Sequence, residues 1–159
     1  MKKAILHRSI FAVVACIALA ASVLLTSVKV TPVVMAEDVK AVLGQEAEAS
    51  FCAFHENLQL WYQGVNATDS GVTLSEESGY QELLTAISSL EGYVTACGTV
   101  TDEEFAVRLN EYNEPMSVML MVAVNLMMAV NTNGSYTFSM ADWTQLGSVM
   151  DTMVSAYQA

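Results

Sequence analysis

Few side chains in this sequence could carry chemistry, and the first group surrounds a histidine. After residue 36 the chain has a single histidine, His55, beside Glu56 and one helical turn from Cys52. A thiol or a carboxylate close to an imidazole could form an activated nucleophile or a metal site. A cysteine held in a disulfide cannot serve in either, and a lone histidine is more often structural, so we expect no catalytic residue in this group.

No familiar catalytic motif occurs elsewhere. The chain has no Gly-x-Ser-x-Gly, no phosphate-binding loop, no His-Glu-x-x-His and no Cys-x-x-Cys. We therefore expect a protein that is not an enzyme.

The methionines are the second group. Residues 37–159 contain eight of them, several spaced for clustering: Met116, Met119, Met121, Met127, Met128, Met140, Met150 and Met153. Grouped thioethers could bind Cu(I), and one methionine with His55 could ligate haem inside a bundle. No histidine or cysteine accompanies them in sequence, and methionine also fills adaptable cores or lines grooves for apolar partners. We favour the packing interpretation and expect no metal and no cofactor.

The polar segment that follows the first predicted helix resembles a calcium-binding loop. Counting from Asn66, Gly71 and Glu77 match the sixth and twelfth positions of an EF-hand loop. The other ligand positions carry too few carboxylates for tight binding, so we interpret the segment as an ordinary polar loop.

Two cysteines remain beyond residue 36, Cys52 and Cys97. An even pair in an exported domain favours a disulfide, and two cysteines allow one intramolecular pairing. We therefore predict a Cys52–Cys97 bond.

The N-terminus resembles a secretory signal. A short basic start precedes an uncharged apolar run over residues 10–28, and Val34-Met35-Ala36 ends in the small residue that signal cleavage requires. We predict a signal peptide over residues 1–36 and an exported domain over residues 37–159, periplasmic or secreted. The alternative is an uncleaved membrane anchor facing outside, because 19 apolar residues are enough to span a bilayer.

Charge excludes one large class of partners. The formal net charge is −11, and beyond residue 36 only Lys40 and Arg108 oppose seventeen acidic side chains. Such a domain repels phosphates, so we expect no nucleic-acid partner.

Apolar periodicity predicts an all-α fold. We expect helices over residues 37–63 and 75–98, a helix that starts near Thr101 and is kinked at Pro115, and a final helix from Ser139 to Tyr157. Short connections between them favour a four-helix up-and-down bundle that follows the signal or anchor helix.

Apolar side chains exceed what such a bundle needs, and residues 116–130 are apolar nearly all round. We therefore expect function by protein–protein interaction or self-association, as a subunit, inhibitor or assembly factor. Two alternatives stay open: a metal or cofactor carrier that uses the methionine-rich helices, and a membrane-anchored subunit of an envelope complex.

Overall fold

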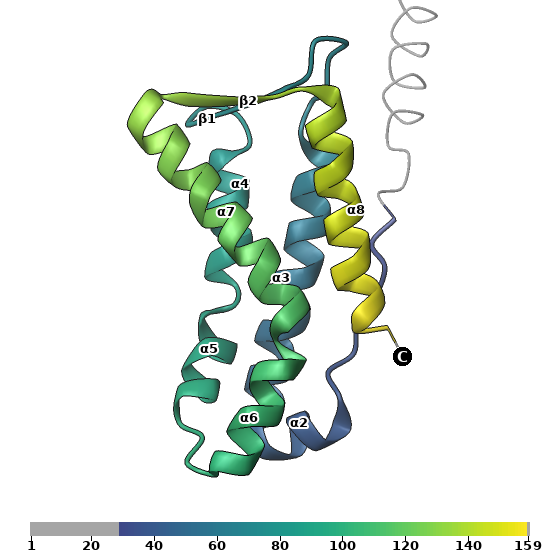
Figure 1. Ribbon diagram of the computed structural model, residues 1–159, viewed down its shortest axis with the longest axis vertical. Helices are drawn as coiled ribbons and strands as arrows, with labels where there is room; N and C mark the ends of the chain where they lie inside the picture. The colour runs from purple at the N-terminus through teal and green to yellow at the C-terminus, as the bar shows by residue number, and fades with distance from the viewer. Residues whose placement is uncertain (1–28, 159) are drawn as a thin grey trace, which may run out of the picture.

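A computed structural model describes residues 29–158, and this part of the chain is mostly helical (Figure 1). The elements follow in the order α2 (Glu37–Leu43), α3 (Gln45–Gly64), β1 (Val72–Ser75), α4 (Tyr80–Ser88), α5 (Glu91–Gly98), α6 (Glu103–Tyr112), α7 (Glu114–Asn133), β2 (Ser135–Phe138) and α8 (Met140–Ala156). Most of the predicted signal peptide, residues 1–28, lies outside the described residues.

Helix α3 forms the centre of the domain. It packs against α2, α4, α5 and α8. Helix α7 runs diagonally in front of α4 and also contacts α8 (Figure 1). The inward face of α3 carries the predicted apolar stripe, and Phe51, Phe54 and Leu58 on it are fully buried. The mostly helical class is confirmed.

The first predicted helix is broken into α2 and α3. Gly44 stands between them with φ +89°, a conformation that side chains with a Cβ rarely adopt. The apolar spacing continues across this break, which is why the sequence predicted one helix.

The second helix, predicted over residues 75–98, begins later than predicted, and it is two helices instead of one. Residues 72–75 form β1, which pairs antiparallel with β2, and Val72 lies opposite Phe138. Val72 and Leu74 are fully buried while Thr73 is exposed, the two-residue period of a strand. A second break, at Ser89 and Leu90, separates α4 from α5.

Predicted helix starts are largely correct in position. Ser139 caps α8, and its Oγ accepts from the backbone N–H of Asp142 at 3.2 Å. At α6 the prediction was one residue early, because the capping side chain is Asp102, not Thr101; its Oδ1 accepts from the N–H of Phe105 at 2.8 Å. Pro115 lies in the first turn of α7, where its missing N–H costs no hydrogen bond.

Candidate functional site

His55 lies at the centre of the aromatic core. Its side chain is fully buried, and neither ring nitrogen has a hydrogen-bond partner among the described residues. The rings of Phe51, Phe54 and Tyr157 surround it, with centroids 4.7, 5.3 and 5.0 Å away. Burial among these rings lowers the pKa of His55 from 6.5 to about 4.

This environment makes His55 a neutral core residue near pH 7. Catalysis would need contact between the imidazole and a substrate, and a fully buried ring offers none. The nucleophile or metal group considered for Cys52, His55 and Glu56 therefore gains no support from the geometry. Within residues 29–158, no three histidine, cysteine or acidic side chains are placed to hold a metal ion.

The predicted Cys52–Cys97 disulfide is not formed, and both cysteines are free thiols. The two thiols have different surroundings. The Sγ of Cys52 donates to the backbone oxygen of Val33 at 3.6 Å, whereas Cys97 lines a groove with Tyr93 and Asn113. Partial burial raises the pKa of each thiol. The prediction failed because it rested on the number of cysteines, which carries no information on which side of its helix each one lies.

The methionines of α7 are divided between a buried and an exposed face of the helix. In α7, Met116 and Met119 are buried in the core, whereas Met121 and Met128 are each 62% exposed.

The segment that resembles a calcium-binding loop is divided between a turn and a strand. A tight turn pairs the backbones of Thr68 and Gly71, and strand β1 occupies residues 72–75.

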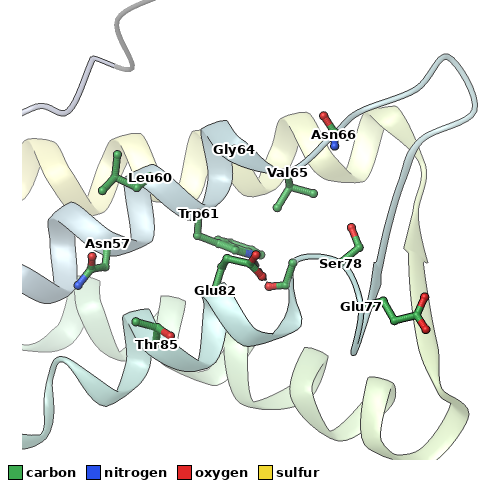
Figure 2. A pocket seen from close by; sticks show the side chains of 11 residues that line it. Asn57, Leu60, Trp61, Gly64, Val65, Asn66, Glu77, Ser78, Glu82 and Thr85 are labelled. Atoms are coloured by element: carbon green, nitrogen blue, oxygen red, sulfur yellow. Dashed lines mark hydrogen bonds between the residues drawn. The ribbon is translucent and has the colours of Figure 1, made fainter. Parts of the chain in front are cut away.

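A cavity of about 510 Å³ opens between the C-terminal half of α3 and the start of α4 (Figure 2). Trp61 lies in its middle and donates from Nε1 to the backbone oxygen of Gly79 at 2.9 Å. The carboxylate of Glu82 lies next to the Trp61 ring, and Glu77 lies at one end of the cavity. With two carboxylates and no cationic side chain in its lining, the cavity is unsuited to anions.

The largest departure from the predicted bundle is the exposure of α7. One face packs inward with alternating three- and four-residue spacing, through Met116, Met119, Ala123, Leu126 and Val130. The opposite face is also apolar and lies open, with Val118, Met121, Val124 and Met128 between 43% and 62% exposed. We call these four residues the α7 stripe. Residues 116–130, which are apolar nearly all round, are therefore buried on one face only.

An apolar groove of about 200 Å³ continues this surface toward α5. Leu90 and Val94 form the α5 side, and Ser117 and Leu120 form the α7 side. Val94 is 55% exposed, so the open apolar surface extends over both helices. Among the helices of residues 29–158, α7 is the one that is both long enough and apolar enough to cross a membrane. Of its apolar segment, 28% is buried against the rest of the domain.

Comparisons of the chain with protein families, with curated proteins and with solved structures find no match.

Proposed function

We propose that this protein is an exported helical domain that binds a basic, amphipathic helix of another protein on the α7 stripe and the adjoining groove. The observation that carries the proposal is the stripe itself. Four large apolar side chains stand more than two-fifths exposed along one face of a helix that has no charge after Glu114. Contiguous exposed apolar surface of this kind is typical of interaction sites.

The charge of the domain favours a basic partner. Residues 37–158 contain two cationic side chains, and each already lies beside a carboxylate. The Nζ of Lys40 is 2.8 Å from Glu48, and Arg108 is 3.7 Å from Asp38. The other carboxylates in that range lack a cationic partner within the domain. The net negative charge of the domain would attract a helix that carries lysine or arginine and would repel a second copy of this acidic chain.

The shape of the surface favours a helix as the occupant. The stripe runs along α7 from Val118 to Met128, and the groove lies beside the N-terminal part of that helix. Methionine side chains adapt to differing partners because they are unbranched and flexible. An apolar helical face with three- and four-residue spacing would lie along such a surface. An assembly factor, an inhibitor or a subunit of an envelope complex would each use a site of this kind.

Synthetic peptides test the proposal directly. Three probes are needed: a helix with a leucine face and lysines elsewhere, the same helix with glutamates in place of lysines, and a scrambled lysine peptide of equal charge. We expect calorimetry to show binding of the first and no comparable binding of the others. Equal binding of the scrambled peptide would mean that charge alone attracts it and would overturn the proposal.

Variants locate the contact. The double change Met121→Gln and Met128→Gln removes apolar surface without adding charge, and we expect it to weaken binding of the lysine peptide at least ~10-fold. Val42→Gln on α2 is the matched control, because Val42 is 55% exposed but far from the stripe in sequence and on a different helix. An affinity unchanged by the double variant would place the contact elsewhere.

A further inference from the structure

Residues 30–36 form an extended strap across the domain, and we infer that this strap is retained in the working protein, so that its N-terminus lies before Thr31 and the chain is not cut after Ala36. The inference is independent of the proposed function. It concerns the bond between Ala36 and Glu37, which the sequence pattern marks as a signal cleavage site. The strap runs beside α8 and down to the start of α2 (Figure 1).

Backbone hydrogen bonds fix the strap to three parts of the fold. The side chain of Gln59 on α3 makes two hydrogen bonds with the backbone of Thr31. Its Oε1 accepts from the N–H of Thr31 at 2.7 Å, and its Nε2 donates to the backbone oxygen of Thr31 at 2.9 Å. The N–H of Val34 donates to the backbone oxygen of Tyr157 at 2.9 Å, just beyond α8. The N–H of Ala36 donates to the hydroxyl of Tyr112, the last residue of α6, at 3.1 Å.

The side chains of the strap alternate between the core and the solvent. Met35 is fully buried and Val33 is 8% exposed, whereas Val34 between them is 43% exposed. Removal of the strap would leave an apolar gap in the core and would take a hydrogen-bond partner from Gln59, Tyr112 and Tyr157.

A cut after Ala36 would also damage the start of α2. Ala36 is the residue that precedes the first turn, and its backbone oxygen accepts from the N–H of Lys40 at 2.9 Å. Cleavage would remove that acceptor and place a positively charged amino group at Glu37, where the helix dipole disfavours positive charge.

The N-terminus of the native protein tests the inference. The full chain is expressed in a secreting host, fractionated, and measured by intact mass. We expect an N-terminus before Thr31, whether the apolar run 10–28 has been kept or cut within. An N-terminus at Glu37, or at any position from 31 to 36, would overturn the inference.

A processing variant gives a readout that does not depend on folding. Ala36→Leu replaces the small residue that a signal peptidase needs directly before its cut. We expect the variant to have the same N-terminus as the unchanged chain. Accumulation of an uncut precursor in the variant alone would show that the cut falls after Ala36.

Two strap variants test the packing in the full chain. We expect Met35→Ser to lower Tm by about 10 °C, because a buried side chain is lost. Val34→Ser is the matched control from the same strap, and we expect Tm to change by no more than about 2 °C because Val34 is on the outer side. Equal Tm values for the two variants would contradict a strap packed into the core.

Discussion

Acid should destabilise this protein through His55, and replacing that residue should remove the effect. The imidazole is buried without a hydrogen-bond partner, so the folded protein holds it in the neutral form. Burial lowers its pKa to about 4. In the unfolded chain the pKa returns to about 6.5, so the unfolded state takes up the proton first as the pH falls.

The size of the effect follows from the two pKa values. The contribution of His55 is fully present above about pH 6.5 and declines as the pH falls toward 4. Between pH 7 and pH 5 the unfolded state gains about 2 kcal/mol from binding the proton. Below pH 4 both states are protonated and the loss levels off at about 3 kcal/mol.

Urea unfolding of the protein and of His55→Leu, at several pH values between 7 and 4.5, measures this term. Leucine has a similar volume and does not titrate. The carboxylates contribute equally to both proteins and cancel in the difference between their free energies of unfolding. We expect that difference to change by about 2 kcal/mol from pH 7 to pH 5, to the disadvantage of the histidine protein. Parallel pH profiles for the two proteins would refute the burial of a neutral imidazole.

Two further predictions concern glycines and cysteines. Gly71→Ala should lower the free energy of unfolding by at least about 2 kcal/mol in denaturant titration, because φ of Gly71 is +128° and a Cβ would collide with the backbone oxygen of Phe138. Gly64 has open space around it, so Gly64→Ala should raise the free energy of unfolding by about 0.5 kcal/mol. Equal effects of the two substitutions would contradict this reasoning. Alkylation of denatured, unreduced protein should label both Cys52 and Cys97 when the peptides are mapped by mass spectrometry; protection of both until reduction would restore the disulfide.

Local signals in the sequence predicted the helical parts well. The caps and stripes act within one or two turns, so a single sequence contains the information they need. Helix α8 illustrates this, since the spacing of its apolar side chains predicted the helix and Trp143, Met150 and Met153 on its apolar face are buried. Phe138, just before the capping Ser139, packs on Trp143 in the first turn of the helix, with ring centroids 5.2 Å apart, which is the hydrophobic contact that often accompanies a helix cap.

The failures arise where the deciding contact is distant in sequence. Strands β1 and β2 have four residues each and are separated by more than fifty residues, so neither shows enough alternation alone to outweigh neighbouring helical signals. The disulfide prediction failed for a related reason, because the number of cysteines does not reveal which elements each thiol faces. The strap was missed because its apolar residues were assigned to a cleavage site rather than to the core.

Helix α7 shows why the sequence alone did not indicate which apolar face would stay exposed. A helix that is apolar on all sides has two equivalent candidate faces, and periodicity cannot decide which one packs inward. The fold decides it, because α4 and α8 cover the side of Met119 and Leu126 and leave the side of Met121 and Met128 open. An exposed face with no structural role tends to acquire polar residues, since apolar ones favour aggregation. The open apolar face of α7 is thus the observation on which the proposed helical partner rests.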